Sequence, residues 1–68
     1  MDEDNLKKLK DYSTWLETAV AQHRHKEDEY RRSQDVSTVF NSLVERAIAN
    51  ALQDQCDKLY KSFPELKP

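Results

Sequence analysis

The chain has 68 residues, with 11 Lys and Arg against 13 Asp and Glu and a formal net charge of −2. This length allows one domain at most (1–68), and a lone core of this size contributes only about 3–5 kcal/mol unless a disulfide, a metal ion or oligomerisation adds to it. The near-neutral charge gives no electrostatic reason to expect a nucleic-acid partner. Residues 1–4 are acidic, unlike a signal peptide, and no stretch approaches the roughly 20 apolar residues of a membrane span.

Cys56 is the only cysteine, so an intrachain disulfide is excluded. A single thiol fits a reducing compartment, and we expect an intracellular protein, cytoplasmic or nuclear. Glycine is absent, and the two prolines, Pro64 and Pro68, lie at the end. Hairpin turns and phosphate-binding loops depend on glycine, so the composition predicts an all-α fold.

The first predicted helix spans about residues 5–32, with Asp4 or Asn5 as its N-cap. Apolar side chains recur there at spacings of three and four, as on one face of a helix. The stretch 23–32 is almost entirely charged, but its acid-before-base pairs four residues apart still favour a helix. The basic residues within it alternate with acids, so a solvated helix face explains them better than a nucleic-acid site.

A turn is predicted at about residues 33–35, with Asp35 as the N-cap of the next helix. No glycine or proline marks this turn, and one uninterrupted helix of about sixty residues, roughly 90 Å long, is the alternative. The second predicted helix spans about 36–63 and ends before Pro64, because the residue preceding a proline disfavours the α conformation. The tail 64–68 is predicted to be frayed.

If the two segments fold as an antiparallel helical hairpin, residues whose numbers sum to about 69 lie opposite each other. At the open end this pairing brings apolar residues together. At the turn end it places Phe40, Leu43, Val44 and Ala47 across from the charged stretch 24–29, which cannot cover them without burying unpaired charge. We therefore expect a second chain to cover that face, giving a dimeric four-helix bundle or coiled coil.

The prediction divides the apolar residues into two sets. The expected oligomer or partner interface is Val36, Val39, Phe40, Leu43, Val44, Ala47, Ile48, Ala51, Leu52 and Leu59. The expected packing between the two helices of one chain uses Leu6, Leu9, Tyr12, Trp15, Leu16, Ala19, Val20, Tyr60 and Phe63.

Candidate chemistry is sparse. His23 and His25 are two residues apart and so point to nearly opposite sides of a helix, while His25 and Glu29 have the spacing of an ordinary surface pair. His23 continues the apolar stripe and is expected to be a partly buried, hydrogen-bonded histidine. Cys56 is expected to act as a small apolar side chain, since two helices offer no evident pocket for a nucleophile. No catalytic residue, metal site or cofactor is predicted, and enzyme activity is not expected.

The sequence therefore predicts a protein–protein interaction module at the start of a larger intracellular protein, assembling with itself as a homodimer. A first alternative is an adaptor that accepts the amphipathic helix of a different protein. A second is a weak nucleic-acid binder that uses dimeric basic helices. No membrane partner is expected.

Overall fold

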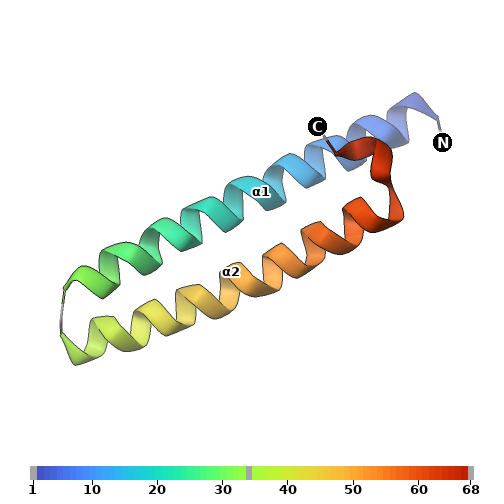
Figure 1. Cartoon of the computed structure of the whole chain (residues 1–68). Coiled ribbons are helices and arrows are strands. Elements are labelled where there is room, and N and C mark those ends of the chain that lie inside the picture. The colour runs from blue at the N-terminus through green and yellow to red at the C-terminus, as the bar shows by residue number, and fades with distance from the viewer. Residues whose placement is uncertain (1, 34, 68) are drawn as a thin grey trace.

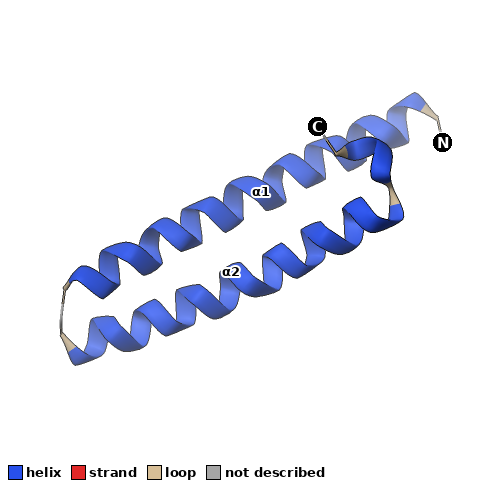
Figure 2. Ribbon diagram, in the orientation of Figure 1, coloured by secondary structure: helices blue, strands red, loops and turns tan. Residues whose placement is uncertain are grey.

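The computed structural model describes residues 2–33 and 35–67 and shows two long helices lying side by side in opposite directions (Figure 1). Helix α1 is Glu3–Arg32, helix α2 is Val36–Ser62, and a short 3₁₀ helix, η1, is Pro64–Leu66. Within the described residues all regular structure is helical (Figure 2). The predicted all-α hairpin is confirmed, and the single continuous helix is not what forms.

The molecule measures 50 × 15 × 15 Å and has a radius of gyration of 15.0 Å. A compact domain of this length would have a radius of about 11 Å. Over the described residues the hairpin is thus a rod two helices wide, in which α1 and α2 pack against each other along one side, and η1 adds a contact to both near the chain termini.

Helix α1 begins two residues earlier than predicted. Asp2 is its N-cap, in extended backbone conformation, and its carboxylate accepts a hydrogen bond of 2.8 Å from the backbone N–H of Asn5. Asp2 therefore takes the role expected of Asp4 or Asn5, which lie inside the first turn. An acid there is favourable because the helix N-terminus carries partial positive charge.

Asp35 caps α2 as predicted, its side chain accepting from the backbone N–H of Ser37 at 3.3 Å. The hydroxyl of Thr38 donates to the Asp35 carbonyl at 2.7 Å. These two bonds start a new helix without a glycine or proline. Of the predicted turn, Gln34 lies outside the described residues.

The predicted frayed tail is wrong for residues 64–66. Helix α2 ends at Ser62, one residue earlier than predicted, and Phe63 leaves the helical conformation at φ −133° ahead of Pro64. The chain then forms η1, which folds back against α1 (Figure 1), and Leu66 is buried. Burying a leucine is worth roughly 1.5–3 kcal/mol, which opposes fraying. Pro68 lies outside the described residues.

The contact between α1 and α2 follows a regular seam. Buried and half-buried side chains alternate at steps of three and four residues, the spacing of antiparallel coiled-coil packing. On α1 these are Leu6, Leu9, Ser13, Leu16, Val20, His23, Glu27 and Tyr30. On α2 they are Thr38, Ser42, Glu45, Ala49, Leu52, Cys56 and Leu59, and Phe63 continues the spacing just after the helix ends.

Candidate interaction surface

The half of the seam near the chain termini is apolar. Leu16 is 1 % exposed and Ala49 is 0 % exposed, and Val20, Cys56 and Leu66 are also buried. This half is the hydrophobic core of the described chain. Much of it is made of small side chains, so the apolar area that it removes from water is modest.

Small residues let the helices approach along the seam. Ser42, Ala49 and Cys56 repeat every seven residues on α2, and all three are buried. The Ser42 hydroxyl donates to the Val39 carbonyl of its own helix at 2.7 Å, and Ser13 donates likewise to Lys10 at 2.8 Å. Because these serines satisfy their polar atoms locally, each presents alanine-like bulk to the opposite helix.

The half of the seam near the turn is polar. Glu27 is buried, and its carboxylate accepts from Arg46 Nε at 2.9 Å and lies 3.7 Å from Arg31 Nη1. His23 Nδ1 pairs with the carboxylate of Glu45. The Glu27–Arg46 and His23–Glu45 contacts join α1 to α2 in the turn half through charge and hydrogen bonds.

This arrangement corrects the predicted face matching. Glu45 and Arg46, not Phe40 and Leu43, meet the charged stretch of α1. The helix is rotated so that its polar side lies inward, because a charged segment is better paired with hydrogen-bonding partners than with apolar side chains. The apolar side of α2 consequently faces outward.

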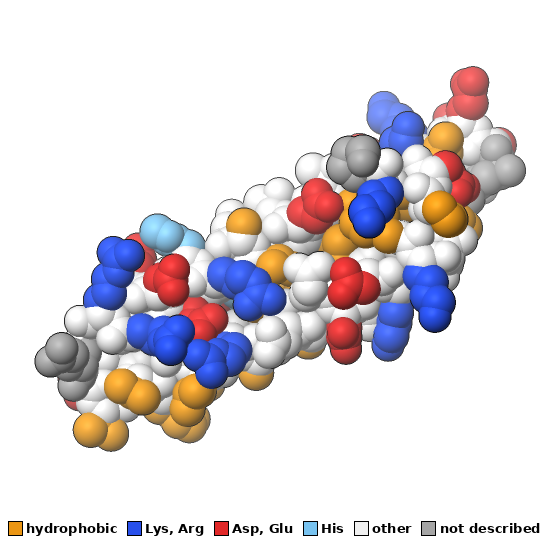
Figure 3. All heavy atoms as spheres, viewed as in Figure 1, with side chains coloured by type: hydrophobic (Ala, Val, Ile, Leu, Met, Phe, Trp, Pro, Cys, Tyr) orange, Lys and Arg blue, Asp and Glu red, His pale blue; other side chains and the backbone are white. Residues whose placement is uncertain are grey.

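We call that side the outer face of α2. Its members lie roughly 120–180° around the helix from Ala49, which marks the seam, at about 100° per residue: Val36, Phe40, Leu43, Val44, Ala47 and Ala51. Val36 is 84 % exposed, Phe40 66 % and Leu43 53 %. Apolar side chains gather at the turn end of the molecule over α2 (Figure 3).

The remaining predicted interface residues lie at the margins of this face. Val39 and Ile48 are exposed on its two flanks, while Leu52 and Leu59 are half-buried in the seam. Of the residues predicted to pack within the chain, Leu16, Ala19 and Val20 are buried, and Leu6, Leu9, Tyr60 and Phe63 are half-buried.

Tyr12 and Trp15 differ from that expectation. They stack on each other with ring centroids 6.2 Å apart, and Trp15 is 59 % exposed. They lie beside the seam rather than in it, because Ser13 and Leu16 occupy the seam positions. This aromatic pair is a second exposed apolar patch, in the opposite half of the hairpin from the outer face.

Sequence reasoning did not include several buried residues in the set that packs within the chain: Ser13, Glu27, Ser42, Ala49, Cys56 and Leu66. They are small or charged, or they follow a proline, so hydrophobicity alone does not select them. The seven-residue repeat of Ser42, Ala49 and Cys56 was the available signal.

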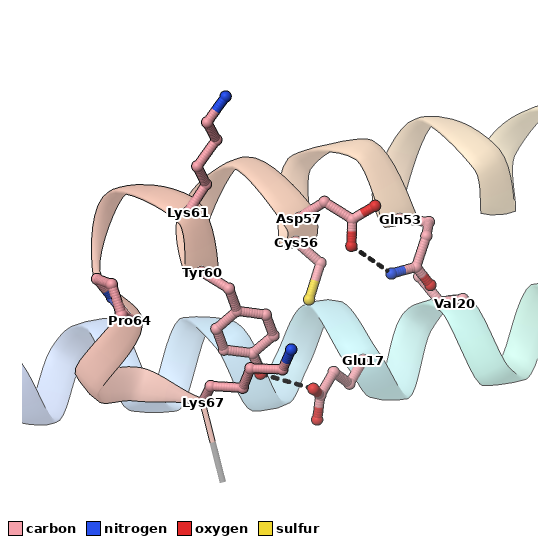
Figure 4. Close-up of a pocket in the computed structure, with 9 residues that line it drawn as sticks. All are labelled: Glu17, Val20, Gln53, Cys56, Asp57, Tyr60, Lys61, Pro64 and Lys67. Atoms are coloured by element: carbon pink, nitrogen blue, oxygen red, sulfur yellow. Dashed lines mark hydrogen bonds between the residues drawn. The ribbon is translucent and has the colours of Figure 1, made fainter.

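A groove of about 610 Å³ lies beside the seam near the termini (Figure 4). Cys56 lines it; burial, with the nearby charge of Glu17, raises the pKa of this thiol. Tyr60 donates to Glu17 at 2.6 Å, and this bond raises the pKa of the Tyr60 phenol. Both groups are held in their protonated forms, which disfavours a nucleophilic role for Cys56. Neither histidine lines this groove.

His25 pairs with Glu29 at 2.9 Å on an exposed side of α1, as its spacing suggested. Across residues 2–33 and 35–67, no three His, Cys, Asp or Glu side chains are grouped as a metal ion would require. Over the same residues, no helix has the length and apolarity needed to span a bilayer.

These features define the chain as an all-helical hairpin with an uncovered apolar face. In comparisons with known proteins, no family model, curated protein or solved structure matches it.

Proposed function

We propose that the chain is a protein–protein interaction module that homo-oligomerises through the outer face of α2. The observation that carries this proposal is the exposure of Val36, Phe40 and Leu43 on a helix face that no described residue of the chain covers. Each large apolar side chain left in water forgoes roughly 1.5–3 kcal/mol, which is considerable for a core this small.

The area is adequate for an interface. With their flanking residues Val39 and Ile48, the outer-face side chains expose on the order of 500 Å², comparable with the largest apolar patch of a typical monomer. A stable dimer buries about 800 Å² from each partner, and uncharged neighbours such as Ser37 and Asn41 supply the remainder.

The charge pattern also supports a self-associating face. Between Val36 and Gln53 the only charged residues are Glu45 and Arg46, and both are engaged with α1. Two copies can therefore meet without like charges opposing each other.

The test is the molar mass in solution, measured by light scattering over a range of micromolar concentrations. We expect a dimer or higher oligomer for the natural sequence and a monomer for Leu43→Asp, because the introduced carboxylate would be buried without a partner. The matched control is Thr18→Asp, which adds the same charge at an exposed position of α1. A well-folded monomer of the natural sequence would refute homo-oligomerisation.

Trp15 reports independently on which surface is used. It is the only tryptophan and lies in the other half of the hairpin from the outer face. If the outer face of α2 is the interface, the fluorescence emission of Trp15 stays that of a solvent-exposed indole upon assembly. A strong blue shift upon assembly would instead place the aromatic pair in the contact.

The adaptor alternative predicts a different outcome. The chain would be monomeric alone, and helicity and thermal stability would rise only on adding a different protein with an amphipathic helix. Circular dichroism at matched concentrations with and without that protein distinguishes the two cases.

A further inference from the structure

Building on the proposed homo-oligomer, we infer that two copies pair their outer faces antiparallel, about a two-fold axis that passes between Leu43 and Val44. The inference rests on how side-chain size changes along the face. The large residues lie on the turn side of that axis and the small ones on the other side.

The sizes are complementary when the second copy runs in the opposite direction. Positions whose numbers sum to 87 then meet, so that Phe40 packs over Ala47 of the second copy and Val36 over its Ala51. Leu43 and Val44 lie beside the axis, so that Leu43 of each copy meets Val44 of the other. Val36 and Phe40 are each opposite an alanine, and such pairing of large with small side chains allows close packing without voids.

A parallel pair lacks this match. Phe40 would face Phe40, while Ala47 would face Ala47 and Ala51 would face Ala51. The phenylalanines would hold the helices apart at one end and leave a gap over the alanines at the other. Such a gap forfeits dispersion contacts along half of the interface.

Charge beyond the apolar face favours the same direction. After Ala51, the next residue on the outer side of α2 is Asp54. In the antiparallel pair it lies opposite position 33 of the second copy, at the turn of that copy. Helix α1 ends there in Arg31 and Arg32. An antiparallel pair brings Asp54 of each chain toward these arginines, whereas a parallel pair brings the arginines of the two copies together.

Distances between nitroxide labels test the direction. We use Lys58→Cys in a Cys56→Ala background, since Lys58 is exposed and lies on α2 beyond the apolar stretch. The two labels should be about 45 Å apart in the antiparallel dimer and about 10–15 Å apart in a parallel one, from the rise of 1.5 Å per residue and the usual helix separation. A label introduced by Ser37→Cys should give about 20 Å and thereby locate the axis.

Disulfide trapping provides a second, label-free test. Chains with Ala47→Cys alone should not cross-link to each other, because the two thiols would be about 10 Å apart along the axis. Mixing them with chains carrying Phe40→Cys should give the covalent heterodimer. Efficient cross-linking of the Ala47→Cys chain to itself would overturn the antiparallel arrangement.

The outcomes separate the two proposals. A dimer by light scattering with a short distance at position 58 overturns the antiparallel axis and leaves the proposed function standing. A monomer with no intermolecular dipolar signal overturns both. Circular dichroism of the Cys56→Ala background shows whether the hairpin folds; if it does not, the same labels are attached with Cys56 retained, because that thiol is buried.

Discussion

The two halves of the hairpin are built in opposite ways. Near the termini, Leu16 and Val20 lie in a seam with Ala49 and Cys56, and most outward-facing residues are polar, with the stacked pair Tyr12 and Trp15 as the exception. Near the turn, Glu27 pairs with Arg46 inside the seam, and Phe40 lies outside it. One half is a small conventional core, while the other satisfies its polar groups within the chain and leaves its apolar groups exposed. The first half supplies the hydrophobic core of the hairpin, and the second leaves exposed the apolar surface that we propose contacts a second copy of the chain.

The largest effect is expected from breaking the terminal half. Leu16→Ala removes a fully buried side chain and should lower the free energy of unfolding by about 2–5 kcal/mol. Urea denaturation followed by circular dichroism measures it. The matched control is Leu43→Ala, the same change on the outer face, whose effect should depend on protein concentration because it weakens assembly. Equal, concentration-independent losses from both variants would contradict the division into two halves.

The next effect concerns η1, which extends the terminal half. Leu66→Ala should destabilise the chain by about 2 kcal/mol, since Leu66 is buried against the hairpin by the fold-back after Pro64. Thermal unfolding of this variant beside Lys67→Ala, a change at an exposed neighbour, provides the measurement. If the two variants melt alike, η1 does not contribute to the core.

A smaller effect should come from the polar seam. Arg46→Met removes the closest partner of the buried Glu27 carboxylate and should cost about 1–2 kcal/mol. Arg31→Met removes a partner that is 3.7 Å away and largely exposed, so its effect should stay within about 0.5 kcal/mol. The urea midpoints of the two variants measure these losses of stability. A larger loss from Arg31→Met would mean that Arg31, and not Arg46, is the main partner of Glu27.

The smallest effect is a dependence on pH at the alkaline end. The pKa of Cys56 is raised above its ordinary value of 9.0 and that of Tyr60 above 10.0, so the folded chain holds these two protons more tightly than the unfolded chain. Their contribution to stability is fully present below about pH 9 and is lost as the pH rises through the folded-state values. Urea midpoints between pH 8 and 11 should fall, and less steeply for Cys56→Ala combined with Tyr60→Phe. Identical slopes would contradict this assignment.

Much of the fold could be predicted from the sequence. Three features of the sequence are local, because each depends on residues that lie close together in the chain. They are the absence of glycine, the spacing of the apolar residues from Leu6 to Val20, and the cap at Asp35. They were enough to predict two helices, the position of the break and the antiparallel hairpin. The first α1 residues and η1 were missed, since Asp2 is only one of several possible caps and Leu66 is held by a contact far away in sequence.

The rotation of α2 about its own axis could not be predicted from the sequence, because it depends on how α2 packs against α1. Hydrophobicity alone selects Phe40 and Leu43 as the buried side, whereas the folded chain buries Ser42, Ala49 and Cys56 instead. Helix rotation depends on how both helices fill one seam, and Glu27, His23 and Arg46 find partners only when the polar side of α2 lies inward. The sequence by itself determined that the second helix carries more apolar surface than the first can cover. The tertiary structure decided that this surface faces outward, because pairing the charges of the turn half between α1 and α2 leaves the apolar face uncovered by any described residue.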